Sequence, residues 1–199
     1  MKAQLVLAFA ILAALAPALA KAPLGPDDIS AGTYVVDGKE TLVRYGTIHM
    51  GFTEFWGTFP GATGTLVIDP KDIAATKLDV SVPVARVSTT SDELDGALVS
   101  PMFFDAGKYP LLRFVANKVE RTGATTAKVT GTLTMHGVSK EVVLNVMFNG
   151  AGPNLFTKVP TIGFKAEGTV KRSDFGLSKF VPIVSDETTI TISAAFEKR

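Results

Sequence analysis

Residues 127–148, which read AKVTGTLTMHGVSKEVVLNVMF, decide the fold because they have the pattern of one long β-hairpin. Apolar or small residues alternate with lysine and threonine from Ala127 to Met135, and the alternation resumes after His136-Gly137 and runs to Phe148. A period of two places one face of each strand in an apolar interior and the other in water. Gly137 suits a tight turn, since glycine adopts positive φ at little cost. An isolated hairpin is only marginally stable, so the rest of the chain must supply more strands.

Further apolar segments with strand character occur on both sides of this hairpin. Ser91 to Leu98 is the one segment with helical features, because Ser91 can cap a helix whose first turn holds Asp92 and Glu93. About eight amphipathic strands with almost no helix to cover them must close on themselves. The sequence therefore predicts an all-β fold, an extended eight-stranded antiparallel up-and-down barrel of the lipocalin type with one short helix. The expected strands outside the hairpin cover residues 42–50, 64–68, 78–84, 112–116, 162–170 and 190–196.

Individual residues predict where these strands are interrupted. Gly46 predicts a bend or a bulge inside the strand over 42–50. Pro83 predicts the end or the edge of a strand, because proline cannot donate a hydrogen bond to a neighbouring strand. Residues 151–160 are expected to form a loop and residues 173–177 a turn.

The first twenty residues have the layout of a secretory signal peptide. Lys2 provides a basic start, residues 5–15 are an unbroken apolar run, and Ala18-Leu19-Ala20 is a small-x-small cleavage site. The run is short for a membrane span, and a retained N-terminal anchor is the alternative. We expect a signal peptide over 1–20, a flexible mature N-terminus over 21–32 and one barrel domain over 33–199. Such a protein is exported to the periplasm or beyond and has no integral membrane anchor after cleavage.

The composition narrows the classes of function. The chain has 20 basic and 19 acidic residues, a balance that gives no support for nucleic acid as a partner. It has no cysteine, which excludes disulfide-stapled scaffolds, cysteine nucleophiles and thiolate metal sites. A zinc site normally needs three or four ligands, which His49 and His136 alone do not supply. Because no Gly-x-Ser-x-Gly turn or phosphate-binding loop occurs either, we expect no enzyme, no metal and no cofactor.

The phenylalanines follow the apolar register of the expected strands. Phe114, Phe148, Phe164 and Phe196 all fall on the inward face. Together with aromatic residues of the connections, such as Trp56, they could line a dry tube suited to a hydrocarbon chain. An eight-stranded barrel is wide enough either to be filled by its own side chains or to hold one small ligand. Periodicity alone leaves both alternatives open.

Several short motifs along the chain carry a resemblance to a known family. They are Tyr34–Asp37, Ile48-His49-Met50-Gly51-Phe52, Trp56-Gly57-Thr58-Phe59, Gly64-Thr65-Leu66, Phe103-Phe104-Asp105 with Tyr109-Pro110, residues 131–138 (GTLTMHGV) and Arg172-Ser173-Asp174-Phe175-Gly176. In this order and spacing they resemble the YceI family, the lipocalin-like, polyisoprenoid-binding proteins of the bacterial periplasm. The resemblance implies a barrel closed by a short helix, with a long apolar tunnel. Its expected ligand is a polyprenyl tail, such as that of an isoprenoid quinone or its precursor.

The strand pattern and this resemblance together predict a lipid site inside the barrel. Arg172 and Asp174, in a turn near a barrel mouth, are expected to contact a headgroup. The chain departs from the family at Glu40-Thr41, where a His-Ser pair is usual. It also departs at residues 94–99 (LDGALV), where the family usually has Arg-Asp-x-His-Leu-Arg, so the region beside the helix is more apolar here. The side chains expected to bind lipid are Tyr45, His49, Phe52, Trp56, Phe103, Phe104, Phe114, Leu133, Leu144, Phe148, Phe164 and Phe175.

The expected function is the binding, storage or transport of a polyisoprenoid or another long apolar lipid. That lipid is the expected partner, and the sequence leaves a homodimer open. Two alternatives also stay open. One is an enzyme acting on a small apolar or isoprenoid substrate, for which His49 is the candidate base. The other is a structural or stress-response protein with a filled core.

Overall fold

The structure is a computed structural model that describes residues 24–199. The expected signal peptide over 1–20 lies outside the described residues. The α-helix is α1 (Asp92–Val99), and the 3-10 helices are η1 (Pro26–Asp28), η2 (Ile73–Ala75), η3 (Val84–Arg86) and η4 (Arg172–Phe175). The strand segments are β1 (Gly32–Val36), β2 (Leu42–His49), β3 (Thr53–Pro60), β4 (Thr63–Ile68), β5 (Lys77–Pro83), β6 (Leu111–Arg121), β7 (Thr126–Met135), β8 (Val138–Pro153), β9 (Pro160–Lys171) and β10 (Glu187–Lys198).

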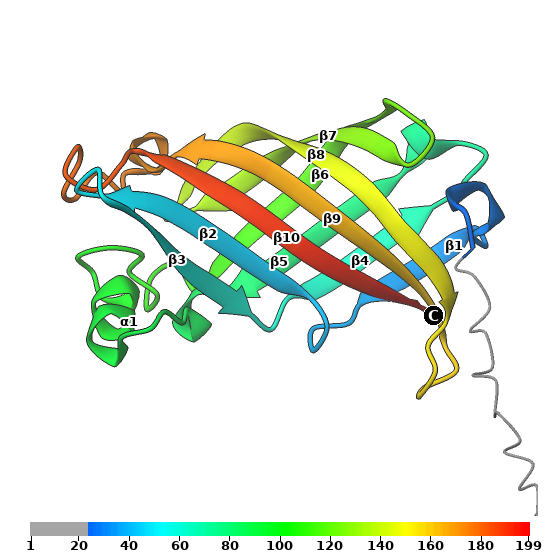
Figure 1. The fold of residues 1–199 in the computed structure, drawn as a ribbon, viewed down its shortest axis with the longest axis horizontal. Coiled ribbons are helices and arrows are strands. Elements are labelled where there is room, and N and C mark those ends of the chain that lie inside the picture. Colours follow the sequence, from blue (N-terminus) through cyan, green and yellow to red (C-terminus); the bar gives the residue numbers. More distant parts are fainter. Residues whose placement is uncertain (1–23) are drawn as a thin grey trace, which may run out of the picture.

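Eight of these strands close into an antiparallel barrel, which confirms the predicted fold. Their order is β1-β4-β5-β6-β7-β8-β9-β10, and β1 pairs back with β10. The pair β2 and β3 does not enlarge this ring, because β2 pairs with β10 beyond the end of β1. Figure 1 shows an elongated barrel with α1 at one end and η1 at the other. These ends are called the α1 end and the η1 end below.

The hairpin formed by β7 and β8 has the predicted register. Ala127 pairs with Val146 and Met135 with Val138, so the inward residues of the two strands face each other, except that Leu133 is opposite the exposed Lys140. His136 and Gly137 form the turn with φ values of 52° and 76°. This left-handed pair fits the twist of the two strands and explains the glycine. The predicted loop over 151–160 is too long, because β8 continues to Pro153 and β9 already begins at Pro160.

Gly46 does not mark a bulge, contrary to the prediction. It pairs with Trp56 of β3 and Thr189 of β10 in unbroken register. A Cβ atom at this position would lie 2.7 Å from Thr189 Oγ1 and 2.9 Å from a Trp56 ring carbon, so the glycine makes room for close side chains. The register shifts lie elsewhere, at 116–118 in β6 and at 148–150 in β8. Pro83 is the last residue of β5, as predicted.

Helix α1 begins where the sequence predicts. The Ser91 hydroxyl accepts a hydrogen bond from the Leu94 backbone N–H at 3.3 Å, which caps the first turn. Asp95 accepts hydrogen bonds from the backbone N–H and the hydroxyl of Thr89, at 2.7 and 2.6 Å, and so fixes the loop before the helix. Leu98 is buried in an apolar cluster with Phe59, and this packing holds the helix against the α1 end of the barrel.

The segment that precedes β1 is in contact with the barrel from residue 24 onwards. This is most of the segment that the sequence predicts to be a flexible mature N-terminus. The Leu24 backbone N–H donates a hydrogen bond to the Ala151 carbonyl at 2.8 Å, and η1 follows directly. Ile29 is buried in an apolar cluster with Tyr34 and Phe196. The segment thereby lies at the η1 end, next to the barrel interior.

Candidate functional site

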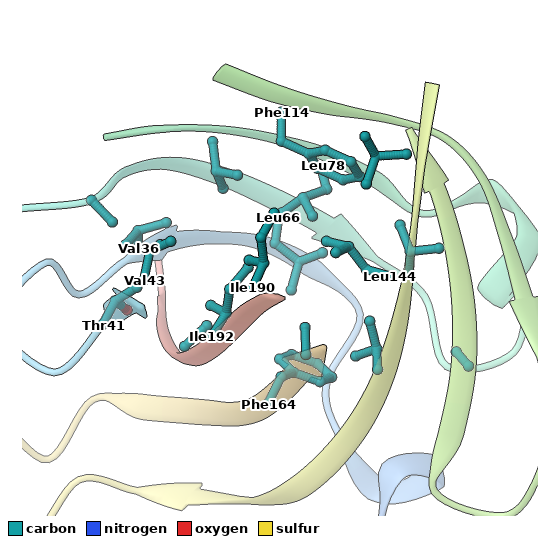
Figure 2. A pocket seen from close by; sticks show the side chains of 18 of the residues that line it. Val36, Thr41, Val43, Leu66, Leu78, Phe114, Leu144, Phe164, Ile190 and Ile192 are labelled. Atoms are coloured by element: carbon teal, nitrogen blue, oxygen red, sulfur yellow. The ribbon is translucent and has the colours of Figure 1, made fainter. Parts of the chain in front are cut away.

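An apolar cavity of about 290 Å³ lies inside the barrel. Figure 2 shows side chains from strands on different sides of the barrel, including Leu66, Leu144 and Ile190, pointing into it. An apolar cavity of about 150 Å³ can stay dry and bind benzene, so this cavity is large enough for part of a hydrocarbon chain. It is close to the lower end of the range of small-molecule pockets, roughly 300 Å³. The structure therefore favours a hollow interior over a filled one.

The alternation of side chains along the strands makes this cavity apolar. In β10, Ile190, Ile192, Ala194 and Phe196 line it, and the residues between them, Thr191, Ser193 and Ala195, do not. The rings of Phe148, Phe164 and Phe196 meet edge to face, with centroids 5.8 and 6.0 Å apart. Such contacts stabilise one wall of the cavity and leave hydrocarbon edges facing inward.

Half of the predicted lipid-binding residues line this cavity. Tyr45 stands at the α1 end, where its ring packs against Phe59 with centroids 5.5 Å apart. Burial, and secondarily the charge of Asp95, raises the pKa of Tyr45 to about 12. The phenol therefore stays protonated at neutral pH and presents an uncharged surface. The predicted residues that line the cavity are Tyr45, Phe114, Leu133, Leu144, Phe148 and Phe164.

Three other predicted residues pack around the closed α1 end without lining the cavity. Phe104 meets Phe59 edge to face at 5.5 Å, and Phe103 lies against Phe180 at 6.1 Å. Phe175 is only 1% exposed and belongs to the core cluster beneath η4. These aromatic side chains close the α1 end of the barrel.

The remaining three predicted residues lie on the outside. Trp56 is an odd number of positions from the inward Phe59, and the Arg44 guanidinium stacks on its ring at 4.5 Å. His49 is exposed at the end of β2 and forms a β-bridge with Val184. Phe52 is 85% exposed in the β2–β3 turn. An enzyme that uses His49 as a base inside the tunnel is therefore not supported by the geometry.

Arg172 does not present its charge to the barrel mouth. Its side chain is buried and donates four hydrogen bonds to backbone carbonyls. Desolvation lowers the pKa of Arg172, and the charge of Asp186 opposes this effect. Asp174 is exposed, and it is Asp186 that accepts hydrogen bonds from the Ser173 backbone and hydroxyl, at 2.9 and 2.7 Å. The four carbonyls belong to Leu177, Lys179, Val184 and Ser185, at 2.6, 2.7, 2.9 and 2.8 Å.

Several aliphatic residues of the cavity were not among the predicted site residues. Leu78 and Val80 of β5, like Ile190 and Ile192 of β10, fall in the inward register, and this alternation could have identified them. Ile29 has no such signal, because it lies before the first strand. Polar side chains also line the cavity. One of them, Thr188, continues the inward register of β10 at the α1 end, and its hydroxyl has no hydrogen-bond partner among the described residues.

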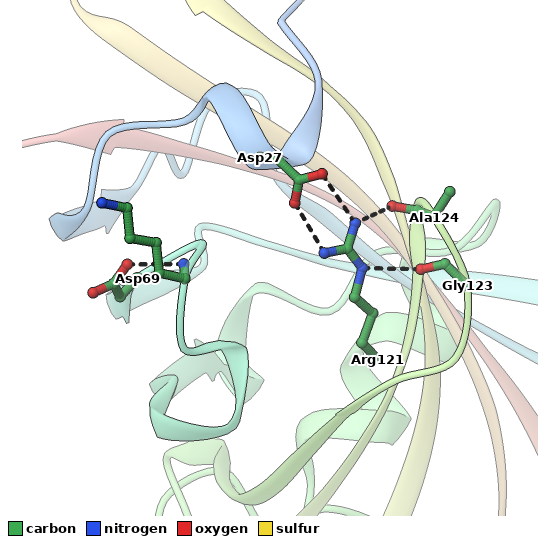
Figure 3. A network of polar contacts seen from close by, with 6 residues as sticks. Asp27, Asp69, Arg121, Gly123 and Ala124 are labelled. Carbon is green, nitrogen blue, oxygen red and sulfur yellow. Dashed lines mark hydrogen bonds and ion pairs between the residues drawn. The ribbon is translucent and has the colours of Figure 1, made fainter.

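The cavity reaches the surface at the η1 end, between η1 and the β6–β7 turn. Arg121 donates hydrogen bonds to both carboxylate oxygens of Asp27, at 2.9 and 3.4 Å, and to the carbonyls of Gly123 and Ala124, at 3.1 and 2.9 Å (Figure 3). The bonds from Arg121 lower the pKa of Asp27 below its ordinary value. We call this surface opening, lined by Pro26, Asp27, Arg121, Ala124 and Thr125, the mouth of the cavity.

The other histidine has a structural position. His136 Nδ1 lies 3.2 Å from the Phe175 carbonyl, so Nδ1 must carry a proton to donate this bond. Its ring packs edge to face against Tyr109 at 4.8 Å. Within residues 24–199, histidine and carboxylate side chains form no cluster of three that could hold a metal ion. The same residues include no helix long and apolar enough to cross a membrane.

Comparison with known proteins places this barrel in a family. The model of the YceI-like domain matches residues 34–196, which cover nearly all of the barrel. The chain belongs to the YceI-like family. A curated relative, the UPF0312 protein of Pseudomonas savastanoi pv. phaseolicola, is 35% identical over 188 residues, which are 94% of this chain and 95% of the relative. The YceI-like family was the one predicted from the motifs.

Solved structures have the same fold. The YceI protein of Campylobacter jejuni superposes with a TM-score of 0.68 and 32% identity, covering 76% of this chain and 90% of that one. A polyisoprenoid-binding domain from Saccharophagus degradans, described as implicated in plant cell wall breakdown, gives a TM-score of 0.60. It covers 85% of this chain and all of the other, but its identity of 13% shows similarity of fold alone.

Proposed function

We propose that this YceI-like protein binds a long apolar lipid, such as a polyisoprenoid, inside its barrel and stores or carries it after export to the periplasm. The observation that carries the proposal is the apolar cavity of about 290 Å³ that reaches the surface at the η1 end. Membership of the YceI-like family and the fold shared with a polyisoprenoid-binding domain support it.

The driving force of this binding is desolvation. Each methylene group that moves from water into the cavity contributes about 0.8 kcal/mol, so a chain of several isoprene units binds without any charged contact. We expect no headgroup contact from Arg172, since its guanidinium is hydrogen-bonded to four backbone carbonyls. A polar headgroup is therefore best placed at the mouth, where Asp27 and Arg121 meet the solvent.

The experiment is native mass spectrometry of the protein purified from its own source without detergent, followed by extraction and identification of the released molecules. We expect a stoichiometric apolar lipid. A matched pair of variants locates it: Ala194→Phe adds a ring inside the cavity, and Ser193→Phe adds the same ring to the outer face of β10. Ala194→Phe should lose the lipid and Ser193→Phe should keep it. Equal lipid content in both folded variants would contradict binding inside the barrel.

A further inference from the structure

The β8–β9 loop carries two apolar side chains that the barrel does not use. Leu155 is 75% exposed and Phe156 is 92% exposed, the largest exposed fraction of any large apolar residue among those described. Adjacent exposed apolar side chains can mark a site of interaction with a protein or a membrane, because burying them there removes apolar surface from water. We call Leu155 and Phe156 the apolar tip.

The loop holds the apolar tip in a defined shape. The Asn154 side-chain oxygen accepts hydrogen bonds from the backbone N–H groups of Phe156 and Thr157, at 2.9 and 3.2 Å. The Asn154 carbonyl accepts a bond from the Lys158 backbone at 2.8 Å, and the Thr157 hydroxyl donates to Glu197 at 3.2 Å. A compact turn therefore presents the two apolar side chains to the solvent.

The apolar tip lies at the same end of the barrel as the mouth of the cavity. Figure 1 shows the β8–β9 loop at the same end of the barrel as η1, where it projects beside the C-terminus. Leu24, two residues before Pro26 of the mouth, bonds to Ala151 near the base of the loop. A surface that contacts the apolar tip is thus brought close to the opening through which a ligand must pass.

A second hollow, of about 160 Å³, lies at the base of this loop. Its lining is largely apolar, so it offers a place for a short length of hydrocarbon chain next to the tip. Two side chains and one small hollow are far too little surface for a stable protein interface, which needs roughly 1,000 Å². The residues that line the hollow include Leu24, Ile29, Ala151, Pro153, Pro160 and Ile162.

Basic residues occur near the apolar tip. Lys158 lies two residues after Phe156, and β10, which pairs with β9, ends at Lys198 and is followed by Arg199. One acidic residue, Glu197, also lies here. Lys158 donates one bond to the Leu155 carbonyl at 2.7 Å, which leaves donors on the same ammonium group for other acceptors. Apolar side chains flanked by cations fit a bilayer surface that contains anionic headgroups.

From these observations we propose that the apolar tip, Leu155 and Phe156, docks the protein on an anionic lipid bilayer and brings the mouth of the cavity to the membrane surface. The proposal rests on the proposed lipid-binding function and adds the route by which the lipid is exchanged. Docking by two side chains is weak and reversible, as a carrier that leaves the membrane with its cargo requires.

The test is flotation of the purified protein with vesicles of phosphatidylethanolamine and phosphatidylglycerol. Leu155→Ser together with Phe156→Ser should lower the bound fraction roughly tenfold or more, because the inserted apolar surface is lost. Lys158→Glu should weaken binding to these vesicles and leave the weaker binding to phosphatidylcholine vesicles unchanged. A tryptophan in the Phe156→Trp variant should be quenched by brominated lipids, which reports insertion without removing the tip.

A matched control uses the other end of the barrel. Phe52 and Ile183, 85% and 59% exposed, belong to apolar residues at the α1 end, and Phe52→Ser with Ile183→Ser should leave vesicle binding unchanged. The proposal would be wrong if the control variant lost vesicle binding while the tip variant kept it. It would also be wrong if brominated lipids did not quench the tryptophan of Phe156→Trp.

Uptake of farnesol from vesicle-free solution separates this proposal from the proposed function. The tip variant should take up farnesol as the unmodified protein does, since the cavity is intact. If the unmodified protein floats with vesicles through its tip but takes up no prenol, the docking proposal stands. The lipid-carrier function would then be wrong.

Discussion

At the scale of single residues, Arg172 shows that a charged side chain can have a structural role in an apolar barrel. It begins η4 directly after β9, two residues beyond the inward Val170, and both residues line the cavity. Burial of a cation is costly unless hydrogen bonds compensate for it, and here four backbone carbonyls of residues 177–185 do so. These bonds hold the β9–β10 connection across the α1 end, so the residue closes the tunnel.

Replacing Arg172 by methionine should lower the free energy of unfolding by about 3 kcal/mol, because several buried carbonyls would lose their partner. Arg172→Lys should recover only part of this, since an ammonium group cannot reach four carbonyls in the geometry of a guanidinium. Urea unfolding followed by circular dichroism measures the effect. The control is Arg113→Met, which breaks an exposed ion pair with Asp79 and should cost far less, because solvent screens the pair. Equal losses in the two methionine variants would contradict a structural role of Arg172.

The sequence identifies inward residues well where a strand is regular and poorly elsewhere. Phe114, Phe148 and Phe164 were predicted from alternation and do line the cavity. Trp56 was assigned to the site because it is aromatic, although its spacing from Phe59 already places it on the outer face. Arg172 was predicted to be an exposed charge. Its hydrogen-bond partners are backbone carbonyls, which every residue has, so no sequence pattern indicates them.

At the scale of elements, α1 and the β7–β8 hairpin form where the sequence predicts because local rules determine them. A capping serine and a glycine turn act within a few residues of where they stand. The N-terminal segment behaves differently. The contacts of this segment with Ala151 and Arg121 join residues more than ninety positions apart in the sequence, and no local pattern predicts such contacts. The mouth of the cavity could therefore not be predicted.

The pair Asp27 and Arg121 fastens η1 beside the mouth, and its strength depends on pH. Because the bonds from Arg121 lower the pKa of Asp27 from 3.8 in the folded protein, the pair contributes fully above that value and is lost as the pH falls through the lower, folded pKa. Asp27→Asn should imitate the acid state at neutral pH. We expect faster amide exchange at Leu24, whose N–H bonds to Ala151, and faster release of a bound lipid.

The control for this effect is an equivalent ion pair in the barrel wall. Asp79→Asn breaks the exposed pair with Arg113, which lies away from η1. Amide exchange at Leu24 should not change in this variant. If both variants accelerated exchange at Leu24 equally, the cause would be a general loss of stability, and the pair at the mouth would have no local role.

At the scale of the whole molecule, the closed ring of eight strands follows from the number of amphipathic segments and the lack of helices to cover them. The expected strands include β2 and β4 but not β1 and β3. In the structure β1 and β2 lie end to end along β10, and β4 and β3 pair with β1 and β2, so the four segments act as two long interrupted strands of the barrel. The cavity could not be predicted either. The same inward register describes a filled barrel and a hollow one, and the difference depends on barrel width and side-chain volume along its whole length.

A tunnel closed at the α1 end and open at the η1 end makes a prediction about chain length. A ligand that enters at the mouth gains stabilisation with each isoprene unit until its first end reaches the residues around Arg172, after which further units stay in water. Thermal unfolding with geraniol, farnesol, geranylgeraniol and longer prenols measures this gain.

A prenol at about one hundred times its Kd stabilises the fold by about 2.7 kcal/mol, which for a chain of this size is a rise in Tm of roughly 5–10 °C. At a fixed prenol concentration we expect the rise to grow with chain length and then to reach a plateau, whose position measures the usable depth of the tunnel. A rise that continues without a plateau would mean that the lipids bind along the outer surface, and a rise that is the same for all chain lengths would mean that only the alcohol group is recognised.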